Sequence, residues 1–206
     1  MQQIFIKTDK SFIPNLPRFA YEGRIFVVQS EAEAKKAVEV LRKSPVLGID
    51  TETRPAFRKG ENHKVALLQV ANDDLCFLFR LNEIGFPPCI SDLLSDSAVL
   101  KVGLSLKDDF LMLKRRNENF HPNGYVELQD FAKKLGIKDM SLQKLYANLF
   151  HKRISKNARL TNWEADILTD SQKVYAATDA VTCIQLYREF KRLEETKDYV
   201  LVDTES

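Results

Sequence analysis

Cysteine is scarce in this chain of 206 residues, whose three cysteines are Cys76, Cys89 and Cys183. An odd number of cysteines excludes a disulfide framework that uses all of them, and no two of these form a C-x-x-C pair. Unpaired thiols are typical of a reducing compartment, so we expect a cytoplasmic protein.

Long apolar runs are also missing. No stretch approaches the roughly 20 apolar residues that span a bilayer, and the first ten residues lack the unbroken apolar region of a secretory signal. The net charge is only +2, so any affinity for nucleic acid has to come from local basic patches. The chain has no internal repeat and no low-complexity tract. These absences predict a soluble, unprocessed protein with no membrane partner.

The chain does have enough apolar material for one folded domain, because 44% of its residues are hydrophobic. Apolar runs of strand length alternate with helical patterns. Strands are predicted at 24–28, 45–52, 65–71, 75–79 and 98–102. Helices are predicted from 30 to about 42 and near 105–116, 129–136, 141–150 and 170–195. The domain core should span about residues 22–196, with a short extension at either end.

The expected sheet is mixed. Residues 72–74 lie between two apolar runs and predict a hairpin with a short turn, which makes the strands at 45–52, 65–71 and 75–79 largely antiparallel. Helices before and after this hairpin have to pack on the sheet. The sequence therefore predicts an α/β protein with a mixed sheet flanked by helices.

Two acids stand at the end of the predicted strand 45–52. Asp50 and Glu52 follow the residues Val46 to Ile49. In a strand, residues i and i+2 face the same side about 6.5 to 7 Å apart, so both carboxylates can approach one ion site. Either acid alone would more often be an exposed strand-end residue.

A phenol and a carboxylate occupy positions i and i+4 of the last predicted helix. Tyr175 and Asp179 are therefore on one helix face, with Cβ atoms about 5 to 6 Å apart. Asp108 and Asp109 lie near the start of an earlier helix and point about 100° apart, so at most one of them faces a shared site. Four converging carboxylates beside a core need cationic compensation, and hard divalent metal ions are the usual solution.

In this order, the acids resemble the DEDDy branch of the DnaQ-like 3′-5′ exonucleases, which includes ribonuclease D and the Werner-type exonuclease domain. The matching motifs are Asp50-x-Glu52, then Gly103 leading to Asp109, then Tyr175-x-x-x-Asp179. The linking segments are closest to the Werner-type pattern, and the resemblance covers roughly residues 25 to 192. It implies a ribonuclease H-like fold with a mixed sheet of five to six strands, and it favours Asp109 over Asp108 as the family acid.

The resemblance also implies a metal-dependent 3′-5′ exonuclease that releases nucleoside 5′-monophosphates from DNA or RNA. Two divalent ions, Mg²⁺ or Mn²⁺, would activate a water and stabilise the leaving oxygen. We assign Asp50 as the ligand shared by both ions, Glu52 and Asp179 to one ion, and Asp109 largely through waters to the other. Tyr175 has an unperturbed pKa near 10, so it is a poor base at neutral pH and should orient the attacking group.

Contacts to a single-stranded or 3′-ended nucleic acid are expected from two basic segments. Residues 151–163 carry four Lys or Arg and no acid immediately before the catalytic helix, which is typical of a phosphate track but also of a solvated loop. A second basic loop follows the D-x-E strand. The candidate nucleic-acid contacts are Arg153, Lys156, Arg159, Trp163 and Arg58. For Trp163, a packing role is the stronger alternative.

Two other functions remain open at this stage. One is a non-catalytic nucleic-acid-binding module of the same fold, which the complete set of acids disfavours. The other is an endonuclease that places an internal phosphodiester in the same ion site. The sequence does not decide between DNA and RNA as substrate.

Overall fold

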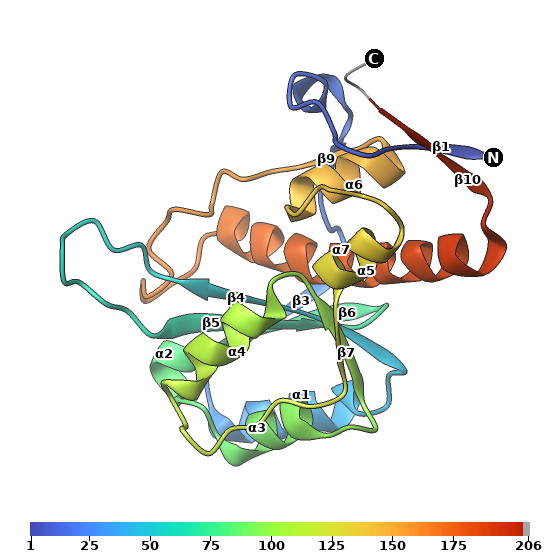
Figure 1. Ribbon diagram of the computed structural model, residues 1–206. Coiled ribbons are helices and arrows are strands. Elements are labelled where there is room, and N and C mark those ends of the chain that lie inside the picture. Colours follow the sequence, from blue (N-terminus) through green and yellow to red (C-terminus); the bar gives the residue numbers. More distant parts are fainter. Residues whose placement is uncertain (204–206) are drawn as a thin grey trace.

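A computed structural model describes residues 1–203 of the chain, and a single six-stranded sheet forms its centre (Figure 1). The strand order is β3-β6-β5-β4-β7-β8. β5 is antiparallel to both β4 and β6, whereas the other neighbours are parallel. The strands are β3 (Arg24–Val28), β4 (Val46–Thr53), β5 (Val65–Ala71), β6 (Leu75–Arg80), β7 (Leu100–Gly103) and β8 (Tyr125–Glu127). The predicted mixed sheet of five to six strands and its hairpin are confirmed.

Helices cover both faces of this sheet (Figure 1). One face packs against α7 (Asp170–Thr196) and α5 (Leu128–Lys134), and α6 (Leu142–Phe150) packs in turn on α7. The other face packs against α1 (Glu31–Leu41), α2 (Leu81–Ile84), α3 (Pro88–Ser95) and α4 (Leu106–Lys114). The apolar face of each helix is buried against the sheet or against a neighbouring helix, and this burial is the main stabilising term of such a layered fold. The sequence patterns did not predict the short helices α2 and α3.

Local signals explain where the longest helices begin and end. Ser30 caps α1 and Thr169 caps α7, in each case with a capping box completed by Glu33 or Gln172. α7 then runs without interruption and ends where Lys197 adopts a left-handed backbone with φ 54°. These caps explain why the predicted bounds of both helices agree closely with the structure.

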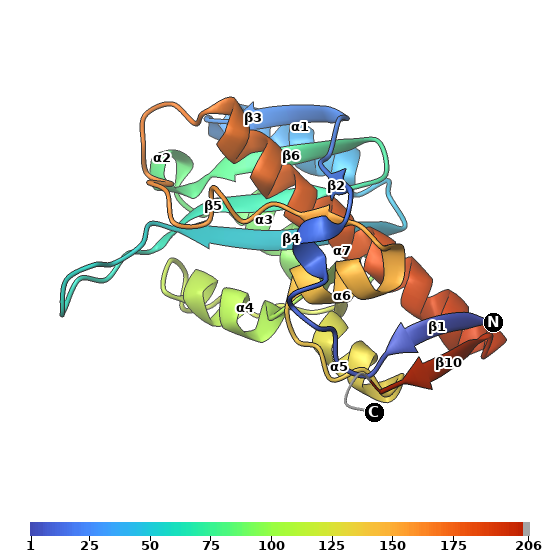
Figure 2. The same ribbon diagram turned by 90° about the horizontal axis from the view of Figure 1, so that it is seen from above.

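The two ends of the chain pair with other parts of the domain (Figures 1 and 2). β1 (Gln2–Phe5) lies parallel to β10 (Tyr199–Val202), and β2 (Arg18–Phe19) lies parallel to β9 (Arg153–Ile154). A short 3₁₀ helix, η1 (Ile13–Asn15), lies between β1 and β2. The segments expected as extensions are therefore packed elements. Their partners are distant in sequence, so periodicity alone gave no sign of the pairing.

None of the helices within residues 1–203 has both the length and the apolar character needed to cross a membrane.

Candidate active site

The carboxylates of β4 lie beneath α7. Val46 to Ile49 are buried, which fixes the strand in the sheet, and Asp50 and Glu52 follow at alternate positions on one side. Only 9% of the Glu52 surface is exposed to solvent. Asp50 accepts a hydrogen bond from the Thr51 amide at 2.9 Å.

α7 brings the third carboxylate to the same place. Its side towards the sheet carries the small residues Ala176, Ala177 and Ala180, so the helix axis can approach β4 closely. One oxygen from each of Asp50, Glu52 and Asp179 lies within 4.8 Å of the others. The structure therefore brings together acids from two elements that are far apart in the sequence, as predicted.

Asp109 lies beside this group and is held by the strand. The Thr51 hydroxyl donates a hydrogen bond to Asp109 Oδ1 at 2.6 Å. The other oxygen, Oδ2, is buried and has no hydrogen-bond partner among the described residues. Asp108 is exposed on the outer side of α4. Of the two neighbouring acids, only Asp109 faces the site.

The start of α4, and with it Asp109, is fixed by a buried acid from the next strand. Ser105 adopts a left-handed backbone with φ 65°, which turns the chain from β7 into α4. Glu127 at the end of β8 accepts a hydrogen bond from the Ser105 amide at 2.9 Å. Glu127 thus acts through Ser105 and positions the helix that carries Asp109.

The electrostatics show that nearby cations offset the charge of this group of acids only in part. Burial, and then the neighbouring carboxylates Asp50 and Asp179, raise the pKa of Glu52 to about 10. Burial likewise holds the pKa of Asp50 and of Asp109 well above the usual range. Burial raises the pKa of Asp179 to about 7, against a hydrogen bond from Tyr175 that lowers it.

The donor set fits hard divalent cations. Four carboxylates contribute only oxygen ligands, and at least one buried oxygen, Oδ2 of Asp109, has no other partner within residues 1–203. Cations bound here would offset the repulsion and the loss of hydration that raise the pKa values. Asp50, Glu52 and Asp179 would form the compact part of such a site, with Asp109 at its edge.

Tyr175 stands one turn before Asp179, and its ring packs against Trp163 with centroids 5.9 Å apart. Burial and the nearby carboxylates raise the pKa of the Tyr175 phenol, so the hydroxyl keeps its proton and acts as a donor. Trp163 is 0% exposed. Its proposed contact with nucleic acid is therefore wrong for this structure, because a ring enclosed by the core cannot stack on a base. The structure instead gives Trp163 the packing role, against the ring of Tyr175.

The remaining basic candidates differ in their distance from the acids. Arg159 and Lys156 are exposed, and their charges act on Glu52 and Asp179 respectively. Arg153 is partly buried, and its Nε donates to the Leu16 carbonyl at 3.0 Å. Arg58 lies on the loop between β4 and β5, which extends away from the body of the molecule (Figures 1 and 2). The structure brings Arg159 and Lys156 to the acids and leaves Arg58 on the outlying loop.

Three residues that shape the site were not expected from the sequence. Thr51 is the residue skipped by the D-x-E motif, yet its hydroxyl holds Asp109. Gly48 lets α7 approach β4. Gln69 on β5 is the cross-strand partner of Asp50, is completely buried, and has no side-chain hydrogen bond within the described part of the chain. A polar residue within an otherwise apolar strand was the available signal for Gln69.

Comparison with known proteins decides the family, since a family model described as 3′-5′ exonuclease matches residues 25–205. The chain belongs to this 3′-5′ exonuclease family. It is 32% identical to an Arabidopsis thaliana 3′-5′ exonuclease over 202 residues, covering 88% of this chain and 68% of that protein. It is 29% identical to the mouse bifunctional 3′-5′ exonuclease/ATP-dependent helicase WRN, covering 88% of this chain but only 14% of the relative.

A solved structure supports the same fold. The exonuclease domain of Aedes aegypti Nibbler superposes with a TM-score of 0.79 at 17% identity, covering 88% of this chain and 94% of that one. The architecture is thus the ribonuclease H-like fold of exonuclease domains, as the sequence resemblance implied. Members of the family hydrolyse phosphodiester bonds, so this 3′-5′ exonuclease chain is a hydrolase that acts on nucleic acid.

Proposed function

We propose that this 3′-5′ exonuclease binds two divalent ions, Mg²⁺ or Mn²⁺, and releases nucleoside 5′-monophosphates one at a time from the 3′ end of a strand. The observation that carries the proposal is the approach of three carboxylate oxygens from β4 and α7 within 4.8 Å, with Asp109 beside them. When bound in such a site, the ions activate the attacking water and stabilise charge on the leaving oxygen.

The chain's own residues would hold the ions and orient the attacking oxygen. Asp50 is central to the four acids and would contact both ions, Glu52 and Asp179 would hold one ion, and Asp109 would complete the other. Thr51 keeps Asp109 directed at the site. The Tyr175 hydroxyl, which donates to Asp179 in this structure, would donate a hydrogen bond to the attacking oxygen when substrate is bound and so orient it. The buried Trp163 behind the Tyr175 ring limits that ring's motion.

Substrate contact would come from the basic segment before α7. The charges of Lys156 and Arg159 act on Asp179 and Glu52, which supports contacts from these side chains to phosphates near the scissile bond, and Arg153 continues the segment. Arg58 would meet a strand only where it passes the outlying loop. The substrate is a single-stranded or 3′-ended nucleic acid. The three free cysteines support a reducing, cytoplasmic location, and we propose that the whole chain acts as one domain.

The experiment that tests this function follows 5′-labelled linear strands and a circular single strand of the same sequence. We expect a ladder of stepwise 3′ shortening on linear strands and no cleavage of the circle, because an exonuclease needs an end. Cleavage of the circle would indicate an endonuclease. Matched DNA and RNA strands in the same assay determine the preferred sugar.

Two controls separate catalysis from binding. Chelation should stop the reaction, and Mg²⁺ or Mn²⁺ but not Ca²⁺ should restore it, since the larger ion tolerates looser coordination. Asp50→Asn and Asp109→Asn should abolish cleavage, whereas the matched change Asp108→Asn on the exposed side of α4 should not. Strand binding without metal-dependent cleavage in the parent protein would instead support the non-catalytic module.

A further inference from the structure

A basic groove lies between the N-terminal segment and α6. Its volume is about 380 Å³, and it is bounded by residues near η1, the start of α6 and β9. Four of the side chains that line it are cationic, and none of the lining residues is acidic. The cations are Lys10, Lys144, Arg153 and Lys156.

The wall formed by residues 1–19, here called the N-terminal arm, is anchored to the domain. Asn148 on α6 accepts from the Phe5 amide at 2.9 Å and donates to the Phe5 carbonyl at 2.8 Å, as a neighbouring strand would. The buried Asp139 accepts from the amide and the hydroxyl of Thr8. These buried contacts hold the part of the arm on which Lys10 lies in one place.

The four cations of the groove are not equally available. Lys144 is used by the fold, since its Nζ contacts Asp139 at 3.2 Å and the Thr8 carbonyl at 2.9 Å. Arg153 is partly used by the Leu16 carbonyl. Lys10 and Lys156 are exposed and form no ion pair with any residue of the described chain. Free positive charge therefore remains on both walls.

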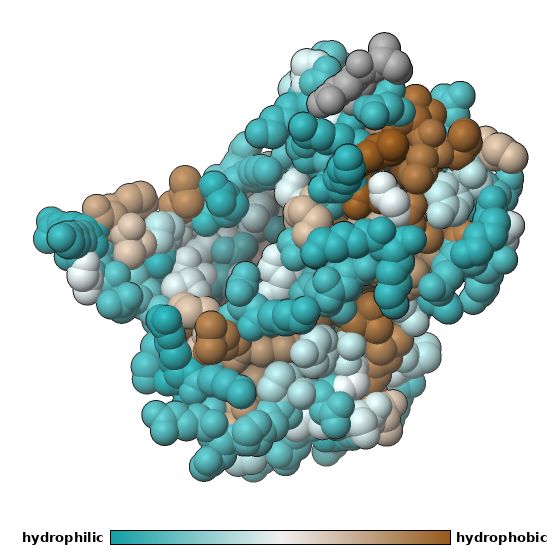
Figure 3. Space-filling model, in the orientation of Figure 1, coloured by the Kyte–Doolittle hydropathy of each residue, from teal (hydrophilic) through white to brown (hydrophobic). Residues whose placement is uncertain are grey.

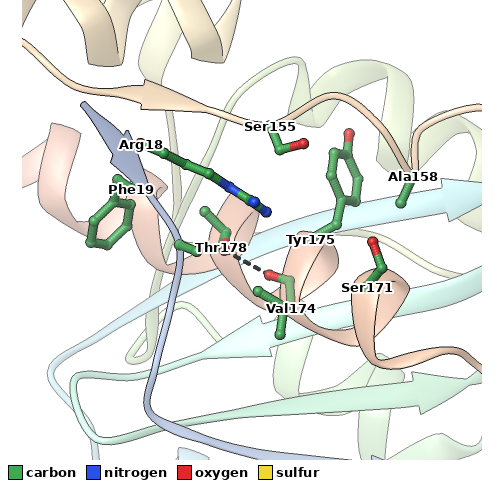
Figure 4. Close-up of a pocket in the computed structure, with 9 residues that line it drawn as sticks. Arg18, Phe19, Ser155, Ala158, Ser171, Val174, Tyr175 and Thr178 are labelled. Atoms are coloured by element: carbon green, nitrogen blue, oxygen red, sulfur yellow. Dashed lines mark hydrogen bonds between the residues drawn. The ribbon is translucent and has the colours of Figure 1, made fainter. Parts of the chain in front are cut away.

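The groove continues towards the active site. Lys156 acts on Asp179, and the preceding Ser155 lines a second, smaller pocket with Tyr175. Arg18 of the arm also lines this pocket, and Figure 4 shows its side chain directed from β2 towards Ser155 and Tyr175. The Tyr21 amide donates to Thr178 on α7 at 3.0 Å, which ties the residues after the arm to the catalytic helix.

The surface around the arm is largely polar (Figure 3). In Figure 3 hydrophilic residues cover the upper part of the molecule where the arm lies, whereas apolar residues gather further along, over β10, where Val200 and Leu201 are exposed. Arg18 is exposed and has no ion pair among residues 1–203. Lys10, Arg18 and Lys156, none of which forms an ion pair within residues 1–203, thus form a series of cations that leads to Tyr175.

We propose that this groove binds the phosphodiester backbone of the strand whose 3′ end lies at the carboxylates, and that Lys10 and Arg18 of the N-terminal arm each contact a phosphate. The inference rests on the proposed function for the identity of its ligand. The arm precedes residues 25–205, which match the family model, so these contacts add to the binding surface of the matched domain.

Binding at several salt concentrations tests the inference. The probe is a fluorescent 12-nucleotide oligothymidylate, measured in EDTA so that it is not cleaved. Each phosphate contact on a single strand contributes about 0.7 to the slope of log affinity against log salt. Lys10→Ala with Arg18→Ala should flatten the slope by about 1.4, which is roughly a 25-fold loss of affinity at 0.1 M salt.

Lys36→Ala provides the matched control, because Lys36 is an exposed lysine on α1, which packs on the opposite face of the sheet. It should keep the parent slope. Melting curves should be unchanged in all variants, since the altered side chains are exposed. A double variant with the parent slope and affinity would overturn the inference.

A second measurement separates this inference from the proposed function. In Mg²⁺, the parent protein should have a higher kcat/KM for a 12-nucleotide strand than for a trinucleotide, which is too short to fill the groove. The double variant should lose this preference for length. Absence of metal-dependent cleavage in the parent would overturn the proposed function alone, because the binding measurement still reports on the groove. If the double variant cleaves and keeps the parent's preference for the longer strand, the proposed groove contacts are wrong while the proposed function stands.

Discussion

Gly48 on β4 lies directly against the backbone of Ala180 on α7. A Cβ atom added to Gly48 would stand 1.9 Å from the Ala180 carbonyl oxygen. Gly48 is two residues before Asp50, and Ala180 follows Asp179, so this contact sets the distance between the carboxylates of the strand and the helix. The missing side chain of one glycine is what allows the acids to meet.

Gly48→Ala should therefore impair both stability and catalysis. The methyl group forces α7 away from β4, which we expect to cost about 1 to 3 kcal/mol in the free energy of unfolding. A displacement of Asp179 by about 1 Å should lower kcat by about 100-fold. Denaturant unfolding and initial rates check these values. Gly60→Ala is the control for catalysis, because its backbone φ of 88° makes an alanine strained while a Cβ there meets nothing within 4 Å, so it should cost some stability and leave kcat unchanged. Full activity of Gly48→Ala would show that the close approach is not required.

Thr51→Val should reduce turnover with little change in substrate affinity. The change keeps the side-chain shape but removes the hydroxyl that donates to Asp109 Oδ1. Loss of this hydrogen bond to a charged group is worth about 1.5 to 3 kcal/mol, or roughly tenfold or more in kcat. Thr51→Ser retains the donor and should restore most of the rate. If Ser and Val variants were equally slow, the methyl group and not the hydroxyl would be the important part.

Tyr175→Phe should slow cleavage without abolishing it. The ring stays packed on Trp163, but one hydrogen bond near the reacting oxygen is lost, an effect of about 1.5 to 3 kcal/mol. At each pH from 6 to 9 the single-turnover rate should be about tenfold to 150-fold below that of the parent protein, and the pH profile should keep the parent shape. If the phenol were the obligatory base, the variant would be as inactive as Asp179→Asn. A rate equal to that of the parent would remove Tyr175 from the mechanism.

Lys101 should make stability depend on pH far from the active site. Burial lowers the pKa of Lys101 to about 8, with Asp96 raising it and Arg42 lowering it further. Between about pH 8 and 10.5 the unfolded chain holds a proton that the folded chain has released, so stability from this group increases as pH rises through that window. The gain should be on the order of 2 kcal/mol.

Urea unfolding of the parent protein and of Lys101→Met at several pH values between 7 and 10 checks this effect. The unfolding free energy of the parent protein should increase relative to that of Lys101→Met as pH increases. Lys36→Met, which alters an exposed lysine, should give a difference that does not depend on pH. A constant difference for Lys101→Met as well would mean that Lys101 stays charged in the folded protein.

Much of the site was determined by sequence because it depends on local geometry. The period of two in β4 places Asp50 and Glu52 on one side, and the helical period places Tyr175 one turn from Asp179. The helix period also showed that at most one of Asp108 and Asp109 faces the site, whereas the choice of Asp109 came from the family resemblance. Caps at Ser30 and Thr169 set the starts of α1 and α7. Each of these relationships spans only a few residues, so the backbone periodicity is sufficient to derive it.

Only the tertiary structure decided how these local pieces meet. The contact of Gly48 with Ala180, the hydrogen bond from Thr51 to Asp109 and the burial of Trp163 depend on how helices pack on the sheet. The pairing of the N-terminal arm with β9 and β10 depends on partners from the far end of the chain. Such contacts are fixed by packing and strand register across the whole fold, and a sequence pattern records only which way a side chain points within its own element.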